Sequence, residues 1–160
     1  MLIPKATLLE LLEYHYDRRR RVLDFLAAKV TPEDFLRPMK AGWSSMQGIL
    51  VHAIQCEEFW VHSAMRQGAQ PDWDSSQYRD AASVRQLAAD VQARTEEFVA
   101  GLTDADLARE ATMTYFSGYT FSFTLAKGFL HMITHETHHR GQVLLLARQL
   151  GYEPPEIDLM

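Results

Sequence analysis

Four of the seven histidines in this 160-residue chain lie within nine residues, at His131, His135, His138 and His139. Apolar residues flank them, and no proline occurs between Ser122 and Gly151, so the spacing predicts one long helix that ends near Gly151. At about 100° per residue, His135 and His139 stand one turn apart on one face, and His131 stands one turn earlier. Neutral imidazole is the commonest side-chain ligand for zinc, nickel, copper and iron. The pattern therefore indicates a metal site.

Two imidazoles at i and i+4 can reach one ion without straining the helix, but two ligands are rarely enough. A third ligand has to come from another part of the chain. The competing interpretation is that these histidines are ordinary core or surface residues with satisfied hydrogen bonds. On the helical wheel Gln142 falls between the histidines, where it would orient a ligand or lie near the surface. Glu136 and Arg140 fall roughly opposite, which predicts a charged face on which Arg140 pairs with an acid or a helix end.

Helical periodicity predicts four long helices, over residues 6–30, from Ser44 or Ser45 to about 67, over 83–100 and over 122–151. A short turn is expected at 31–38, a loop at 68–78 and one helical turn at 103–107. Residues 112–123 alternate β-branched and aromatic side chains around a Ser-Gly turn, which predicts a short hairpin or extended loop. The sequence therefore predicts an all-α four-helix bundle with that extended segment before the last helix, in a single domain, 1–160.

The second predicted helix carries a further histidine, His52, on its inward face. Alone, such a residue is more often a satisfied core histidine than a ligand. Cys56 lies one turn further on, and we interpret it as a small buried hydrophobe. Glu57 and Glu58 point away from the face of His52 on the wheel, which argues against a carboxylate at this site. In the first helix, the basic run Arg18–Arg21 is expected to form a solvated face with acidic partners such as Asp17 and Asp24.

Composition excludes several classes of protein. The formal net charge is −5 and the chain contains one cysteine, with a pI of about 5.8. This acidic balance argues against a nucleic-acid partner, and a single cysteine excludes an internal disulfide. No apolar run reaches the length of a membrane span, and the first residues lack the pattern of a signal peptide. We therefore expect a cytoplasmic protein with no membrane partner.

Three segments of this chain together resemble the DinB/YfiT-like family. They are His52 with Glu57 to Trp60, His135 to Gln142, and the closing residues Gly151 to Asp158. The resemblance covers nearly the whole chain, and the His-Arg-Gly-Gln ending of the HxxxH motif is its most specific part. It implies a four-helix bundle, often a homodimer, that binds one divalent metal such as zinc or nickel through three histidines. Those histidines match His52, His135 and His139, so the resemblance supplies the third ligand, whereas the spacing supplied only the pair.

Three imidazoles leave an open coordination position, which is typical of catalytic rather than structural metal sites. Such a position can activate water or hold a thiolate. Some members of the resembled family are transferases or isomerases that use low-molecular-weight thiols, so the resemblance favours a thiol S-transferase, whereas activation of water would make the protein a hydrolase. The alternative is a non-catalytic metal-binding protein used in stress, which a metal walled off by Trp43, Phe59 and Phe116 would favour. No catalytic residue is assigned, and His131 is the main rival to His135 as a ligand.

Overall fold

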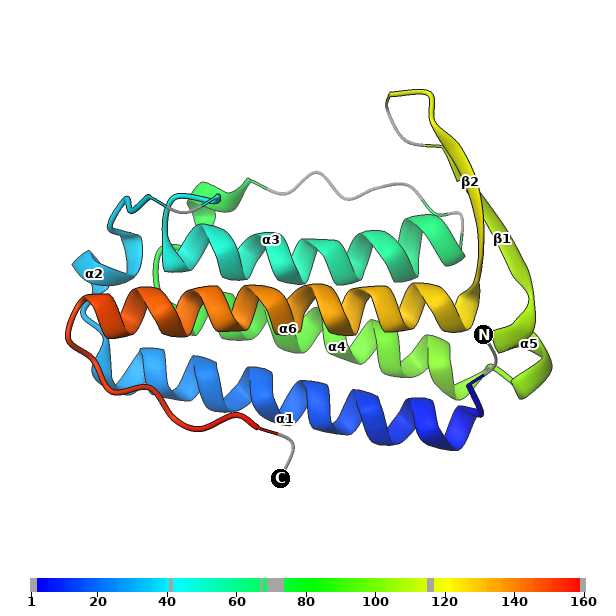
Figure 1. Ribbon diagram of the computed structural model, residues 1–160, viewed down its shortest axis with the longest axis horizontal. Coiled ribbons are helices and arrows are strands. Elements are labelled where there is room, and N and C mark those ends of the chain that lie inside the picture. Colours follow the sequence, from blue (N-terminus) through cyan, green and yellow to red (C-terminus); the bar gives the residue numbers. More distant parts are fainter. Residues whose placement is uncertain (1–2, 41, 67, 69–73, 115–116, 159–160) are drawn as a thin grey trace.

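The long helices lie side by side along the long axis of the molecule (Figure 1). The computed structural model describes residues 3–40, 42–66, 68, 74–114 and 117–158. The long helices are α1 (Lys5–Lys29), α3 (Met46–Glu58), α4 (Ala81–Ala100) and α6 (Leu125–Gln149). Helices α1 and α3 each contact both α4 and α6, so every long helix has two long neighbours. The prediction of a mostly helical chain is confirmed.

Shorter elements connect the long helices. They are α2 (Pro32–Leu36), the π-helical stretch η1 (Phe59–Met65), the 3-10 helix η2 (Ser75–Gln77) and α5 (Asp104–Ala108). η1 continues directly from α3, so the helix expected to reach about residue 67 changes its hydrogen-bonding pattern on the way. Strands β1 (Glu110–Thr114) and β2 (Thr120–Thr124) form the expected antiparallel hairpin, which extends away from the helices (Figure 1). Phe116, one of the residues considered as a wall of the metal site, lies outside the described residues, as does Trp73 in the loop expected at 68–78.

Side-chain caps fix where the two site-bearing helices begin. Ser45 Oγ accepts a hydrogen bond from the backbone N–H of Gly48 at the start of α3. Thr124 Oγ1 accepts one from Lys127 N at the start of α6. Such caps satisfy donors that have no partner within the helix. Helix α6 starts three residues later than predicted because residues 120–124 pair with β1 instead.

The apolar core is divided into two clusters along the helices. On α1 the residues up to Tyr16 belong to one cluster and those from Val22 onward belong to the other. Between them, at the same level on neighbouring helices, lie five buried polar side chains: His15, Arg19, Glu57, Glu136 and Arg140. The interior of the molecule is therefore apolar at both ends and charged in the middle.

The prediction that residues 18–21 form a solvated face is wrong for Arg19, which belongs to this charged layer. Arg19 is only 3% exposed, and its guanidinium group contacts the carboxylates of Glu57 and Glu136. Arg20 and Arg21 are exposed and pair with Asp17 as expected. The consecutive residues of a helix point in different directions, so one basic run can supply both a surface and an interior charge.

The prediction that Glu136 and Arg140 lie on a separate charged face of α6 is also wrong. Both are buried, at 2% and 1% exposure, because that side of α6 packs against α1. Nη1 of Arg140 lies 3.2 Å from Oε1 of Glu136, which agrees with the pairing with an acid that was expected for Arg140. The helical wheel separates two faces of a helix, but it does not show which neighbour covers each face. No helix in the described part of the chain is long and apolar enough to cross a membrane.

Candidate metal centre

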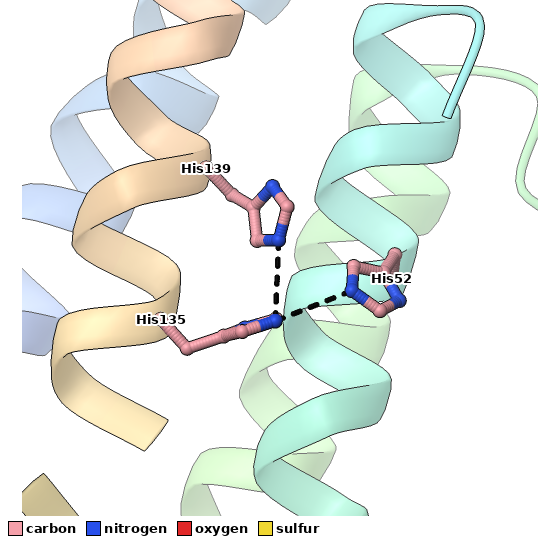
Figure 2. Close-up of side chains that lie close together, drawn as sticks. All are labelled: His52, His135 and His139. Atoms are coloured by element: carbon pink, nitrogen blue, oxygen red, sulfur yellow. Dashed lines mark hydrogen bonds between the residues drawn. The ribbon is translucent and has the colours of Figure 1, made fainter. Parts of the chain in front are cut away.

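Three imidazoles from two neighbouring helices point into one space (Figure 2). His52 comes from α3, and His135 and His139 come from α6. The Nε2 atom of His135 lies 3.3 Å from Nε2 of His52 and 3.2 Å from Nε2 of His139. The ligand atoms of these three residues lie within 4.8 Å of one another. The structure thus brings together the three residues that the resemblance selected, and the same ring nitrogen of each faces the common space.

This convergence suits a metal ion better than it suits hydrogen bonds. Each nitrogen of a neutral imidazole carries either one proton or one lone pair. Nε2 of His135 can therefore form a hydrogen bond with at most one of its two histidine neighbours. An ion about 2.0–2.1 Å from each nitrogen, in tetrahedral geometry, holds its ligand nitrogens about 3.3–3.4 Å apart. The two measured separations, 3.3 and 3.2 Å, are close to that spacing. The donor set and its dimensions therefore fit one tetrahedral transition-metal ion.

Gln142 prepares His139 for this role. Nδ1 of His139 lies 2.7 Å from Oε1 of Gln142, and Nε2 of Gln142 lies 3.1 Å from Nε2 of His138. An amide oxygen only accepts, so His139 must carry its proton on Nδ1. That tautomer leaves the lone pair of Nε2 directed at the common space, as in metal sites where a second group orients the ligand. Of the two roles that the sequence allowed for Gln142, its contacts support the orienting one.

The surroundings keep the three imidazoles neutral. Burial, together with the neighbouring His139, lowers the pKa of His52 to about 4. Burial and four nearby histidines lower the pKa of His135 to about 4. Burial is also the main cause of the lowered pKa of His139. At neutral pH the ring nitrogens therefore have lone pairs available for a cation.

The ring of Trp43 lies against the ring of His52. The two rings stack, with centroids 3.9 Å apart and an interplanar angle of 18°. The turn that carries Trp43 is held by a 2.8 Å hydrogen bond from Ser45 N to the carbonyl oxygen of Trp43. A Cβ atom at Gly48 would overlap that same oxygen, so the first turn of α3 needs glycine there. Trp43 is itself 51% exposed, and His52 and His135 remain partly exposed.

A second group of possible ligands, His15, Glu57 and Glu136, lies in the charged layer. The guanidinium group of Arg19 contacts both carboxylates, so a side-chain cation already occupies the position between them. Arg140 Nη1 donates to Glu136 at 3.2 Å and lies 3.3 Å from Nδ1 of His15. Sequence reasoning missed this layer, although polar residues within the apolar register of α1 were a signal for it.

Neither carboxylate of the charged layer is free to accept a proton. Burial alone would raise the pKa of Glu57, but Arg19, His15 and Thr95 together outweigh it and hold that pKa well below its ordinary value. For Glu136, burial is again outweighed by Arg19 and His15, and the pKa falls to about 2. Both groups stay ionised and bound to guanidinium groups, which agrees with the expectation that Glu57 serves no role at the histidine site.

His131 and Cys56 flank the three histidines without joining them. The ring of His131 stacks on that of His135, with centroids 5.8 Å apart, and lies 4.6 Å from the ring of Trp60. Burial raises the pKa of the Cys56 thiol to about 12, so it stays protonated at neutral pH and packs at the edge of an apolar cluster. This agrees with its interpretation as a small hydrophobe.

Fold and site together define a mostly helical protein in which histidines from two adjacent helices can hold one metal ion. The DinB family model matches residues 4–160, and the chain belongs to the DinB family. The resemblance seen in the sequence is thus confirmed. A search of the curated proteins found no match.

Two crystal structures of DinB-like proteins share this fold. One, from Bacillus cereus ATCC 10987, has a TM-score of 0.78 and 20% identity, over 98% of this chain and 99% of that one. The other, YjoA from Bacillus subtilis, has a TM-score of 0.68 and 18% identity, over 94% of this chain and 99% of that one. At such identities the likeness shows the fold alone.

Proposed function

We propose that this DinB-family chain is a metal-dependent enzyme built on a four-helix bundle. In this proposal His52, His135 and His139 bind one divalent transition metal ion through their Nε2 atoms. The observation that carries the proposal is the convergence of three neutral imidazoles at metal-ligand spacing, with Gln142 holding the required tautomer of His139. Imidazole ligands suit zinc, nickel and copper, and the choice among them depends on availability.

The arrangement supports catalysis of the thiol S-transferase or hydrolase type. When bound, such an ion lowers the pKa of a water molecule or thiol at its open position. Gln142 orients His139, and the ring of Trp43 supports His52. The buried carboxylates take no part because they are paired with Arg19. A low-molecular-weight thiol is the co-substrate that the family resemblance suggests.

A non-catalytic metal-binding protein used in stress is the competing function. A site closed to small molecules would favour it. The partial exposure of His52 and His135 favours the enzyme instead, because a substrate can then reach the ligands. Thiol-transfer and ester-hydrolysis screens with metal-loaded protein separate the two, since only the enzyme turns over substrate at a rate that falls when the metal is removed.

The metal itself is tested first. Elemental analysis of protein purified without a metal-chelating column is expected to give one divalent transition metal per chain. In metal titrations, alanine substitution of His52, His135 or His139 should weaken binding by more than about 100-fold, beyond the usual cost of losing a residue that only supports a ligand. His15→Ala and His138→Ala are controls that should bind almost normally. Full-affinity binding by His52→Ala would refute the three-histidine site.

We also propose that the protein is a homodimer, as the family resemblance suggests, and that it is cytoplasmic, as its composition and single cysteine suggest. Leu145 on α6 is 53% exposed and offers an apolar contact for a second copy. Sedimentation at micromolar concentration tests this, and a chain that stays monomeric there is not a stable dimer.

A further inference from the structure

A cavity of about 450 Å³ lies between the hairpin and the start of α6, and none of the three histidines lines it. Its volume is within the range of small-ligand sites. The walls are formed mainly by aromatic side chains: Trp60, Tyr119, Phe121 and Phe123. Three of its other lining residues, Lys127, Gly128 and His131, belong to α6. Neither the charged layer nor the metal proposal gives this cavity a role.

The aromatic walls suit a flat apolar group. The ring of Trp60 meets that of Phe123 edge to face, with centroids 5.0 Å apart and an angle of 83°. Tyr119 stacks on Phe121 at 5.9 Å and 18°, and Tyr119 is 65% exposed although it is a large aromatic residue. Aromatic rings attract further rings in stacked or edge-to-face geometry. An aromatic ligand would therefore find both kinds of contact here.

The charge of the cavity favours an anion. Lys127 is exposed and makes no ion pair with any residue that the structure describes. No acidic side chain lines the cavity, although the whole chain carries a net charge of −5. An unpaired ammonium group beside an apolar surface attracts a carboxylate more strongly than the same group in open water would.

The cavity is in line with the candidate metal centre. Lys127, His131, His135 and His139 follow one another at four-residue steps along one face of α6, which is about 6 Å of helix per step. The ring of His131 contacts Trp60 on one side and His135 on the other, at 4.6 and 5.8 Å between centroids. A ligand held in the cavity would therefore have one end directed towards the three histidines.

We propose that this cavity binds a planar aromatic carboxylate, with its ring against the aromatic surface formed by Trp60 and the hairpin residues and its carboxylate against Lys127. We further infer that it is the part of the active site that recognises the substrate. This second statement rests on the proposed function, whereas binding itself does not require a metal.

Titration calorimetry with 2-naphthoate tests the binding, using the full chain in EDTA so that no metal is present. The neutral analogue 2-naphthylmethanol measures the aromatic contribution alone. Lys127→Gln should lower the affinity for 2-naphthoate by about fivefold, as expected for an exposed ion pair, and leave the affinity for 2-naphthylmethanol unchanged. Lys127→Arg should retain the affinity. Lys29→Gln, an exposed lysine on α1, is the matched control and should have no effect.

The aromatic walls are tested by Tyr119→Ala, which removes an exposed ring and leaves the core intact, and by Phe121→Ala. Each substitution should lower the affinity for both ligands, by up to about tenfold. The proposal is overturned if 2-naphthoate does not bind, if Lys127→Gln weakens both ligands equally, or if a second copy of the chain fills the cavity and excludes the ligand. Metal titration of the unsubstituted chain is read separately. If that chain binds metal but not 2-naphthoate, this inference alone is refuted, and if it binds 2-naphthoate but no metal, the proposed function alone is refuted.

Discussion

At the scale of single residues, the candidate metal centre depends on where one proton lies. Gln142 contacts two histidines at once, through Oε1 to His139 and through Nε2 to His138. Only the first contact concerns the three converging rings, because it fixes the N–H of His139 on the outer nitrogen. His135 differs, since its Nδ1 is buried without a hydrogen-bond partner among the described residues. The tautomer of His139 is therefore set before any ion arrives, and the tautomer of His135 is not.

The role of Gln142 predicts a graded loss of metal affinity. Gln142→Leu removes the acceptor for Nδ1–H of His139 and should weaken metal binding by about 10-fold to 100-fold. Gln142→Glu keeps an oxygen at that position and should retain most of the affinity, although it loses the donor to His138. Competition titrations against a chromophoric chelator measure both variants. Equal affinities for the leucine and glutamate variants would show that the acceptor is unimportant.

At the scale of elements, the charged layer joins the long helices to one another. Arg19 of α1 contacts Glu57 of α3 and Glu136 of α6. Thr95 of α4 donates a 2.7 Å hydrogen bond to Glu57, so each of the four long helices contributes a side chain. Buried charges must be paired because an unpaired one loses its hydration without compensation. Sliding α3 against α6 would break these pairs, so the layer fixes the relative positions of the helices that carry the three histidines.

Removing Arg19 should therefore be costly. Arg19→Leu leaves two buried carboxylates without their cation and should lower the free energy of unfolding by about 3–5 kcal/mol. Arg20→Ala, on the exposed side of the same helix, is the matched control and should change it by less than about 0.5 kcal/mol. Urea denaturation followed by circular dichroism gives both values. A loss below 1 kcal/mol for Arg19→Leu would mean that the layer contributes little to the fold.

Two helical glycines should respond in opposite ways to alanine. Gly141, on α6, has no atom within 4 Å of an added Cβ, so Gly141→Ala should raise the free energy of unfolding by about 0.4–1 kcal/mol. At Gly48 the Cβ would overlap the carbonyl oxygen of Trp43, so Gly48→Ala should lower it and displace Trp43 from His52. Thermal unfolding and the tryptophan fluorescence spectrum report the two effects. Stabilisation by Gly48→Ala would contradict the close approach of this turn.

At the scale of the whole molecule, stability of the metal-free protein should depend on pH in two steps. The pKa values of His52 and His135 are lowered to about 4 from an ordinary value of about 6.5. Between these values the unfolded chain binds more protons than the folded one, so the free energy of unfolding falls as pH decreases from about 6.5 to 4. The lowered pKa values of Glu57 and Glu136 cause a further loss in the free energy of unfolding below about pH 4.5. This loss begins near the ordinary pKa of a glutamate, because the unfolded chain takes up protons there.

Urea denaturation in EDTA across this pH range measures the effect. The double variant with His52→Gln and His135→Gln should show a flatter dependence between pH 6.5 and 4.5, while the loss at lower pH remains. An unchanged slope in the double variant would show that these two histidines are not held neutral by the fold.

The sequence alone determined those features that depend on local spacing. Periodicity gave the long helices and the hairpin, because helical and extended segments repeat at different intervals. The i, i+4 spacing of His135 and His139 placed them on one face for the same reason. Similarity to a family extended this pair to His52, a distant residue that no local rule connects to α6.

The tertiary structure decided which helix covers each face. The basic run looked like surface from its charges alone, yet Arg19 is buried because α3 and α6 supply carboxylates beside it. The cavity beside the hairpin likewise forms where η1 lies beside β2 and α6, from which it is distant in sequence. A helical wheel describes one element in isolation, whereas burial and charge pairing depend on the neighbours that the completed fold places around it.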